Sequence, residues 1–401
     1  MTPSEPHDIR PPASPEGAIE TSVLVIGAGP YGVAVGLDLH LSGVPVQVCG
    51  EPFALWFNHT ITNASLRSDV RTSEVYCRDG RYSLPGFLKR TLGPERAAQI
   101  VTDRVPVAVF RDYLRDVVQR LPFDVRREQV RELSRVGDRF HARTDAGHTL
   151  IADQVVLACG VGEYRHLPDF LRALETDRVI HGWNTQAYEN LQGKRIMVVG
   201  RGQSAGEAIA ELKPNNQVTW VYRSDVIYHA DPIHLPKSLF ELALLGSRVF
   251  AYLPSKLRSS LTKAFVGTTM TPDLKAHVEA PDVQRIRKDA QSLDLTLRDG
   301  LIHSRSLGQD FDYLVACTGY KPGVDRIRFL APELRDGITK IGAMPLLNRS
   351  FETTVPGLFM VGGLAEPIHG PAQRFMVGAR NATLAVCPVL VRRCRATAMA
   401  G

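Results

Sequence analysis

The chain has 401 residues, with 44% hydrophobic and 22% charged side chains and a formal net charge of +6. This composition is typical of a soluble globular protein of two or three domains. The basic residues are scattered without interleaved aromatic residues, which argues against nucleic-acid binding. No apolar run is long enough to cross a membrane and the start lacks a signal-peptide pattern, so we expect a cytoplasmic protein without a transmembrane segment.

The first segment, residues 1–19, is rich in Pro, Glu and Ser and is expected to form a flexible tail. The apolar run at 23–26 then predicts a buried parallel strand that leads into a helix. A glycine-rich turn joins this strand to the helix. The turn reads Gly27-Ala28-Gly29-Pro30-Tyr31-Gly32.

A second glycine-rich turn follows the apolar run at 196–199 in the same way. In such a turn the first glycine permits a tight bend and the second lets the backbone approach a pyrophosphate, while the helix N-terminus offers N–H groups to the phosphates. Because each turn can seat one pyrophosphate, two turns predict two dinucleotides held face to face. The second turn reads Gly200-Arg201-Gly202-Gln203-Ser204-Ala205.

The two turns differ in the side chain that follows the next strand. Glu51 comes after the first of these strands, at the place where a carboxylate accepts hydrogen bonds from the ribose hydroxyls. Arg223 comes after the second, where a guanidinium would attract a 2′-phosphate that Glu51 would repel. We therefore assign FAD to the first turn and NADPH to the second. A solvated surface arginine is the alternative explanation of Arg223.

A weaker internal repeat supports two domains. The segments 153–160 and 312–319 both run from Asp to Gly as an apolar strand that ends in small residues, which lets the chain pass close to a nucleotide. The expected fold is therefore α/β, with two interleaved Rossmann-like dinucleotide-binding domains. We place the FAD domain at 20–165, the NADPH domain at 166–321 with a helical insertion at 225–282, and the return to the FAD domain with a C-terminal helix at 322–401.

The six cysteines contain no Cys-x-x-Cys pair. Flavoproteins that reduce disulfides need a redox dithiol beside the flavin, so this branch is excluded, and a cysteine-based metal site is disfavoured for the same reason. We expect no metal, and we expect the cysteines at strand ends to act as small apolar filler.

Two segments carry a family resemblance. Residues 200–207 have the pattern GxGxSAxE, and Thr318-Gly319-Tyr320 ends the second repeat. With them the chain resembles, over about residues 20–390, the class B flavoprotein monooxygenases, which comprise flavin-containing, N-hydroxylating and Baeyer–Villiger enzymes. Leu66-Arg67-Ser68 and the segment 370–375 resemble a bacterial branch labelled FAD-dependent urate hydroxylase-like or N-hydroxylase-like.

The chain also departs from the family pattern. The Baeyer–Villiger fingerprint FxGxxxHxxxW is not met, because no Phe-x-Gly precedes His181 and Trp183 follows it too soon. Ketone oxygenation is therefore disfavoured. The late segment ending in Gly362-Gly363 resembles the family's flavin-binding segment, but Gly363 replaces the Asp that would bind the ribityl chain.

The resemblance implies that NADPH reduces FAD and that O2 then adds at flavin C4a to give a hydroperoxide that oxygenates a small-molecule substrate. It places Asn63 beside the peroxy group and the nicotinamide amide, although an Asn-capped turn would also explain this residue. Arg67 belongs to the same segment, and Arg374 would add positive charge near the flavin or bind the substrate. Asn63, Arg67 and Arg374 are our candidate catalytic residues.

Further positions are expected near the flavin. Trp56 matches the family position that packs on the flavin edge, although a core position would explain it equally well. Gly370 and Pro371 are expected to open the last helix and to aim its positive end at flavin N1 and O2. His369 is expected to be a satisfied turn residue and not a catalyst.

The insertion at 225–282 has an apolar, arginine-studded helical pattern between 239 and 265. It predicts a lid over the active site or a subunit surface, which allows a homo-oligomer, with membrane-surface contact as a lesser possibility. A plain core-facing helix is the alternative. We expect substrate identity to reside here and in residues 69–105, where the family pattern is weakest.

The expected function is that of an NADPH-dependent FAD monooxygenase that oxygenates a nitrogen or sulfur centre, with N-hydroxylation favoured. A Baeyer–Villiger or ring-hydroxylating monooxygenase is the nearest alternative. Two alternatives come from other classes, namely an NAD(P)H–flavin electron-transfer reductase and a non-catalytic flavin-binding protein. Neither explains as well a second complete nucleotide turn.

Overall fold

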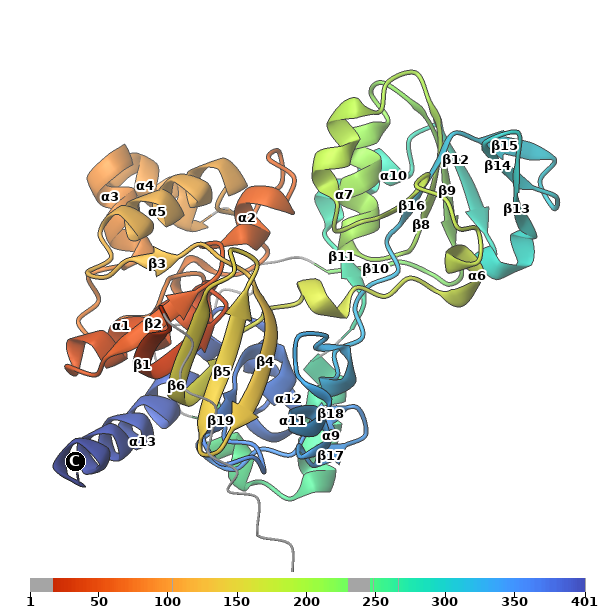
Figure 1. The fold of residues 1–401 in the computed structure, drawn as a ribbon. Helices are drawn as coiled ribbons and strands as arrows, with labels where there is room; N and C mark the ends of the chain where they lie inside the picture. Colours follow the sequence, from red (N-terminus) through yellow and green to blue (C-terminus); the bar gives the residue numbers. More distant parts are fainter. Residues whose placement is uncertain (1–16, 103, 230–245, 248, 266, 401) are drawn as a thin grey trace, which may run out of the picture.

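The computed structural model describes residues 17–102, 104–229, 246–247, 249–265 and 267–400. The chain forms two lobes, each built on its own sheet, which is mixed in the first lobe and parallel in the second (Figure 1). Most of the expected N-terminal tail and the segment 230–245 of the expected insertion lie outside the described residues. Among the helices that are described, none is long and apolar enough to span a bilayer.

The first sheet has seven strands in the order β3-β2-β1-β6-β5-β4, with β19 paired to β6. Its nucleotide-binding half is parallel, because β1 pairs with β2 and β6, and β19 joins β6 in the same direction. The antiparallel strands β4 and β5 extend the other edge. The strands are β1 (Ile19–Ile26), β2 (Val46–Cys49), β3 (Val125–Arg126), β4 (Val130–Val136), β5 (Arg139–Thr144), β6 (Thr149–Leu157) and β19 (Leu358–Met360).

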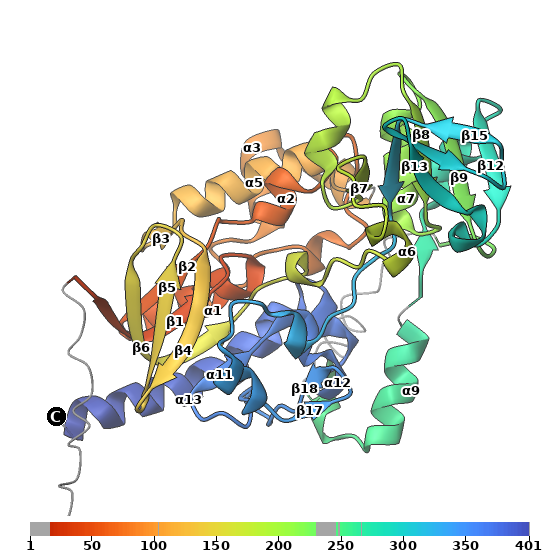
Figure 2. The same ribbon diagram turned by 45° about the vertical axis from the view of Figure 1, so that its right-hand side comes forward.

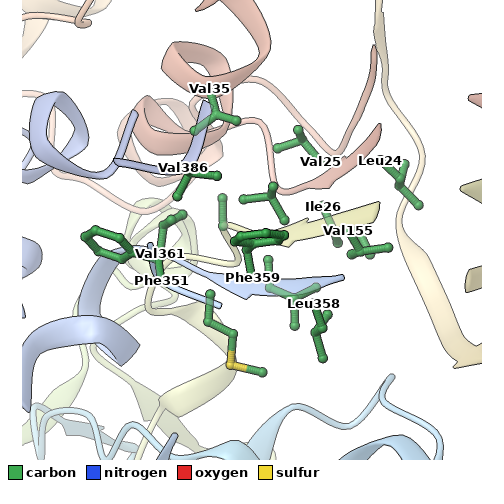
Figure 3. Close-up of a cluster of buried hydrophobic side chains, with 14 of the residues drawn as sticks. Leu24, Val25, Ile26, Val35, Val155, Phe351, Leu358, Phe359, Val361 and Val386 are labelled. Carbon is green, nitrogen blue, oxygen red and sulfur yellow. The ribbon is translucent and has the colours of Figure 1, made fainter. Parts of the chain in front are cut away.

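Residues from both ends of the chain build one core against this sheet (Figure 3). Val35 of α1 (Pro30–Leu41) and Val386 of α13 (Gly378–Ala400) are fully buried and belong to the same cluster as Val25 and Phe359 of the strands. The C-terminal part of the chain is therefore an integral layer of the first domain, which explains why β19 can return to a sheet begun at residue 19.

A helical subdomain continues the first domain and has its own core, which includes Phe110, Tyr113 and Leu114. It lies at the upper left in Figure 1. Its elements are α2 (Ala54–Asn58), η1 (Val70–Thr72), α3 (Leu84–Leu92), α4 (Pro94–Thr102) and α5 (Val107–Gln119).

The second sheet is parallel throughout, in the order β12-β9-β8-β16-β7. A three-stranded antiparallel sheet and the helices α6, α7 and α10 complete this domain. The elements are α6 (Asp169–Arg172), β7 (Val179–His181), η3 (Thr185–Asn190), β8 (Arg195–Val199), α7 (Gln203–Leu212), β9 (Gln217–Tyr222), α10 (Lys275–Val278), β12 (Val283–Arg287), η6 (Ala290–Leu293), β13 (Leu295–Arg298), β14 (Leu301–Ser304), β15 (Gln309–Phe311) and β16 (Tyr313–Ala316).

Two chain segments cross side by side between the lobes. The outgoing segment contains η2 (Gly162–Tyr164), and the returning segment pairs with it through an Arg165–Tyr320 bridge. Lys321 N–H donates to the Tyr164 carbonyl at 2.8 Å. All strands of the first sheet thus fall within 19–157 and 358–360, and those of the second within 179–316. We propose the domain boundaries given above on this basis.

The part of the insertion that is described reaches from the second domain back to the first. The parallel pair β10 (Ile227–Tyr228) and β11 (Thr269–Met270) lies between the lobes (Figure 1). The elements η4 (Phe250–Tyr252) and α9 (Ser255–Phe265) contact α12 (Glu366–His369) of the first domain. Figure 2 shows α9 beneath the second lobe. The remaining elements are η5 (Pro272–Leu274), η7 (Val324–Arg326), α11 (Pro332–Asp336), β17 (Lys340–Ile341), β18 (Met344–Pro345), η8 (Gly362–Ala365) and η9 (Pro371–Arg374).

One expectation about local structure is wrong. Gly370 and Pro371 begin the short 3-10 turn η9, whereas the last helix starts only at Gly378. The turn ends because Phe375 is extended, with φ −117° and ψ 162°. Proline at the first helical position fits either kind of helix, so the sequence alone does not reveal how soon the turn stops.

Candidate functional site

The first glycine turn has the shape of a pyrophosphate cradle. Gly27 has φ +109°, and a Cβ there would lie 2.3 Å from the Ala158 carbonyl oxygen. A Cβ on Gly32 would lie 1.8 Å from the Gly27 carbonyl oxygen. At Gly29, by contrast, a Cβ would meet no atom of the described residues within 4 Å, and Gly29 precedes α1 without any side-chain cap. The open space and the uncapped N–H groups at the start of α1 fit a dinucleotide pyrophosphate.

The Tyr31 side chain connects the first glycine turn to the two glycine-containing segments near residues 362 and 370. Its hydroxyl lies 2.9 Å from the Gln373 carbonyl oxygen and 2.8 Å from that of Phe375. Burial holds the pKa of Tyr31 well above its usual value, so the hydroxyl stays a proton donor. A Cβ on Gly362 would lie 3.9 Å from the Tyr31 ring, whereas Gly363 faces open space. Gly362, Gly363, Gly370 and Pro371 therefore belong to segments that gather around the first turn.

The second glycine turn repeats this geometry except at its middle glycine, where a Cβ on Gly202 would lie 3.0 Å from Thr268 Cγ2. Gly200 has φ +143°, and a Cβ there would lie 2.4 Å from the Cys317 carbonyl oxygen. Gly202 precedes α7 without a side-chain cap, and Ala205 is fully buried where the third small residue of the motif is needed. Ser204 is exposed at the start of α7. The second turn thus offers the same kind of anion site at the carboxyl end of β8 in the second sheet.

The side chains expected at the two adenosine pockets lie where the strands place them. Glu51 follows β2 and is half-exposed, 3.7 Å from the Arg127 guanidinium. Arg223 follows β9, is exposed, and forms no ion pair with any other described residue. A positive charge without such a partner at this strand end is available to a 2′-phosphate.

Sequence reasoning missed two further arginines near Arg223. Arg201 donates to the Asp225 carbonyl at 2.9 Å, and Arg287 forms an ion pair with the Asp225 carboxylate at 2.9 Å. Arg287 lies beside Tyr222 in the sheet register, so β12 brings it to the same edge. Arg287 could have been recognised as a neighbour of this strand end only from the parallel pairing of β9 with β12.

The loop that carries Asn63 is held from one side by Arg111 of α5. Its Nε donates to the Trp56 carbonyl at 2.7 Å, and its Nη atoms donate to Thr62 Oγ1 at 2.7 Å and to the Thr60 carbonyl at 2.6 Å. The Asn63 side chain is exposed. Arg111 was not among the predicted site residues, because nothing in the local sequence ties it to a loop some fifty residues earlier.

Trp56 packs its ring edge-on against Phe110, at 4.9 Å between ring centres. Its indole Nε1 is buried and has no hydrogen-bond partner among the described residues. A buried N–H without an acceptor is costly, and an acceptor on a bound cofactor would relieve it. The role of Trp56 at the flavin edge stays a prediction.

The two predicted arginines, Arg67 and Arg374, contact different parts of the protein. Arg67 Nη2 donates to Thr269 Oγ1 of the second domain at 2.7 Å. Arg374 forms an ion pair with Glu366 at 2.7 Å, and the Glu366 side chain is almost fully buried. The buried carboxylate holds the guanidinium in place, while the Arg374 side chain stays 41% exposed.

His369 is buried and neutral. Its ring stacks on Phe351 at 3.5 Å between ring centres, and Nε2 lies 3.0 Å from the Asn348 carbonyl oxygen. Burial lowers the pKa of His369 to about 4. The side chain therefore has a packing role, although it ends helix α12 and does not lie in a turn as we expected.

The returning crossover carries the predicted residues Thr318, Gly319 and Tyr320. The Thr318 hydroxyl donates to the His166 carbonyl, and Tyr320 packs edge-on against Trp183 at 6.1 Å. Burial raises the pKa of Tyr320 to about 12 and that of the neighbouring Cys317 thiol to about 12. These groups therefore stay protonated at neutral pH.

The fold and these two sites define a class: a protein with two dinucleotide-binding domains, of the kind found in flavoenzymes that use a nicotinamide cofactor. The comparisons with known proteins agree. A family model described as L-lysine 6-monooxygenase/L-ornithine 5-monooxygenase matches residues 100–278, and an FAD-NAD(P)-binding model matches residues 24–162. These matches confirm the expected resemblance to class B flavoprotein monooxygenases and the expected FAD and NAD(P) cofactors.

Solved structures share the fold over almost the whole chain. The ornithine hydroxylase of Pseudomonas aeruginosa has a TM-score of 0.73 at 16% identity, with 93% of this chain and 99% of that chain covered. The ornithine N-hydroxylase of a Kutzneria species has a TM-score of 0.74 at 16% identity and the same coverage. The α/β fold with two dinucleotide-binding domains is thereby confirmed.

The curated relatives include both reductases and monooxygenases. A ferredoxin–NADP reductase of Paracidovorax citrulli is 25% identical over 378 residues, which cover 92% of this chain and 88% of that protein. An L-ornithine N(5)-monooxygenase of Burkholderia cepacia is 27% identical over 236 residues, which cover 50% of this chain and 52% of that protein.

Proposed function

We propose that this protein is an NADPH-dependent, FAD-containing monooxygenase that N-hydroxylates the primary amine of a small molecule. The observation that carries the proposal is the pair of glycine turns, each joining the carboxyl end of a buried strand to a helix start without a side-chain cap, together with the match to a family of lysine and ornithine monooxygenases. A chain that binds one dinucleotide needs only one such turn. The substrate class follows the description of that family.

The cofactor roles follow from the two turns. We assign the FAD pyrophosphate to Gly29 and the N-terminus of α1, and the FAD ribose to Glu51. We assign the NADPH pyrophosphate to Gly202 and the N-terminus of α7, and the 2′-phosphate to Arg223. Bound FAD supplies the electron-transfer and oxygen-activating chemistry.

The remaining roles belong to side chains of this chain. The exposed amide of Asn63 both donates and accepts hydrogen bonds, so it can orient polar groups of the flavin and nicotinamide. Arg111 holds the backbone on either side of that loop. Arg374, held by buried Glu366 but 41% exposed, can donate to an anionic group of the substrate or cofactor. Phe250 of the insertion closes over Gly370, where a Cβ would lie 2.8 Å from the Phe250 ring, and thereby helps to exclude water.

A second candidate function is supported by one observation. The ferredoxin–NADP reductase of Paracidovorax citrulli aligns with 92% of this chain, a wider span than the ornithine monooxygenase match. The chain would then pass electrons from NADPH through FAD to a small redox protein, and no oxygen would enter a product. Ring hydroxylation and Baeyer–Villiger oxygenation remain narrower alternatives within the oxygenase class.

The experiment that separates these functions uses FAD-loaded protein and NADPH. One arm offers ornithine, lysine and a panel of other primary amines in air, and measures hydroxylamine product per NADPH consumed. The other arm offers ferredoxin and measures its reduction without oxygen. We expect at least one amine to give product in near-equal yield with NADPH. Rapid ferredoxin reduction without product from any amine would overturn the proposal. We further propose that the enzyme acts in the cytoplasm, and its subunit number is open to measurement.

A further inference from the structure

The loop at 59–68 belongs to the first domain but is held at both ends by the second. At one end the His59 ring stacks on Trp183, with ring centres 4.0 Å apart, and His59 Nδ1 lies 3.1 Å from the Trp183 carbonyl oxygen. At the other end Arg67 donates to Thr269 Oγ1 at 2.7 Å. Asn63 lies between these two anchors. A movement of the second domain would therefore displace this loop.

Arg104 makes the link between the loop and the second domain direct. Its Nε donates to the Leu66 carbonyl at 3.3 Å and its Nη2 to the Ser65 carbonyl at 3.2 Å. Its Nη1 forms an ion pair with Asp273 Oδ1 at 2.6 Å, and the arginine side chain is only 19% exposed. Because the guanidinium is planar and rigid, the position of Asp273 and that of the two loop carbonyls are fixed by the same group.

A short path joins Asp273 to the second glycine turn. Gln203 is the first residue of α7, directly after Gly202. Its side-chain Oε1 accepts from the backbone N–H of Thr271 at 2.9 Å, and its Nε2 donates to Thr271 Oγ1 at 3.2 Å. Thr271 is completely buried, and Asp273 follows two residues later. A shift of the start of α7 on ligand binding would therefore reach Asp273 through the buried, hydrogen-bonded Thr271.

We propose that the Arg104–Asp273 pair couples occupancy of the second glycine turn to the order of the loop that carries Asn63, which makes Arg104 a positioning residue. The inference rests on the proposed binding of NADP(H) at that turn. Coupling of this kind is reciprocal: dinucleotide binding orders the loop, and a loop released from Asp273 weakens dinucleotide binding.

The test measures hydrogen exchange of the backbone at 59–68 in FAD-loaded protein, with and without NADP+. NADP+ affinity is measured in parallel from the change in flavin absorbance. Asp273→Asn removes the ion pair across the domains. Asp112→Asn is the matched control, since it removes an ion pair of the same type with Arg115 inside α5, also on the surface. Arg104→Lys keeps the charge opposite Asp273 but cannot reach both loop carbonyls.

In the wild type and in Asp112→Asn we expect NADP+ to slow loop exchange severalfold. In Asp273→Asn this protection should be lost, and the NADP+ dissociation constant should rise about twofold to fivefold, the range of a partly exposed ion pair. In Arg104→Lys the protection should be lost as well, and the NADP+ dissociation constant should rise by a similar factor, because the coupling is reciprocal. A purely structural role of the ion pair would leave the NADP+-dependent slowing of loop exchange as it is in the wild type.

Full NADP+-dependent protection of the loop in Asp273→Asn would overturn the coupling, and so would its absence in the wild type despite tight NADP+ binding. If the wild type does not bind NADP+ at all, the affinity measurement shows this first. That outcome overturns the proposed function and removes the premise of the coupling with it.

Discussion

The substitution Gly29→Ala separates cofactor binding from folding at the first glycine turn. Gly29 has φ −79° and ψ −173°, a backbone conformation that alanine adopts without strain. The added Cβ would meet no atom of the described residues within 4 Å. In our account the space that this methyl group enters is reserved for the FAD pyrophosphate.

The two expected effects differ strongly in size. Without FAD, the free energy of unfolding should change by less than about 1 kcal/mol, because no contact is lost and a glycine is removed from the unfolded chain. With FAD, the methyl group should push the pyrophosphate away from at least one backbone N–H. A hydrogen bond to a charged group contributes about 1.5–3 kcal/mol, so the FAD dissociation constant should rise about tenfold to a hundredfold.

Two assays measure these quantities, namely urea unfolding of the apoprotein and titration of apoprotein with FAD by quenching of flavin fluorescence. Gly86→Ala is the control, because a Cβ there meets only the Ser83 side chain, at 3.6 Å, in helix α3. The control should leave FAD affinity unchanged and change the free energy of unfolding by no more than about 1 kcal/mol. Wild-type FAD affinity in a stably folded Gly29→Ala protein would refute the assignment of FAD to this turn.

Three single side chains give further predictions. Arg223→Ala should raise the KM for NADPH about tenfold and leave that for NADH nearly unchanged, because only NADPH carries the 2′-phosphate; steady-state kinetics with both cofactors measures this. Tyr31→Phe should cost about 1–2 kcal/mol of unfolding free energy in urea titrations, since it leaves the carbonyls of Gln373 and Phe375 without their shared donor. His369 has a pKa lowered to about 4 by burial, so the unfolded chain binds its proton more readily. The stability from this residue should be complete above about pH 6.5 and fall by about 3 kcal/mol as the pH drops to about 4, and His369→Gln should remove most of that slope in unfolding measured at several pH values.

Each of these has a contradicting outcome. Equal loss of NADPH and NADH turnover in Arg223→Ala would remove the arginine from the 2′-phosphate site. Unchanged stability of Tyr31→Phe would mean that the late segments are held by other contacts. A pH profile of His369→Gln that parallels the wild type would show that another group titrates in this range.

The nucleotide-binding turns can be predicted from the sequence because the residues that shape them lie close together in the chain. Gly27 and Gly32 are required by backbone contacts within a strand, a turn and a helix, and such contacts recur wherever this motif occurs. Glu51 follows the next strand for the same reason. The alternation of strands and helices then predicts the layered fold.

Contacts between segments that are distant in the chain could not be predicted from the sequence. Arg104, Arg111 and Arg287 look like ordinary surface arginines in the sequence, and they acquire roles only when tertiary packing brings a loop or a strand edge to them. The wrong prediction that Gly370 opens the last helix has a related cause. The start of a helix can be recognised from Gly-Pro, but its length depends on how the residues after that start pack against the rest of the domain.

The measurement that tests the central claim most directly is the origin of the oxygen in the product. FAD-loaded protein, NADPH and an amine that stimulates NADPH consumption are incubated under oxygen gas labelled with the heavy isotope, and the product is analysed by mass spectrometry. Our account predicts a hydroxylamine that carries one labelled oxygen atom from the gas. An unmodified amine, with all consumed NADPH recovered as hydrogen peroxide or as a reduced protein acceptor, would contradict it.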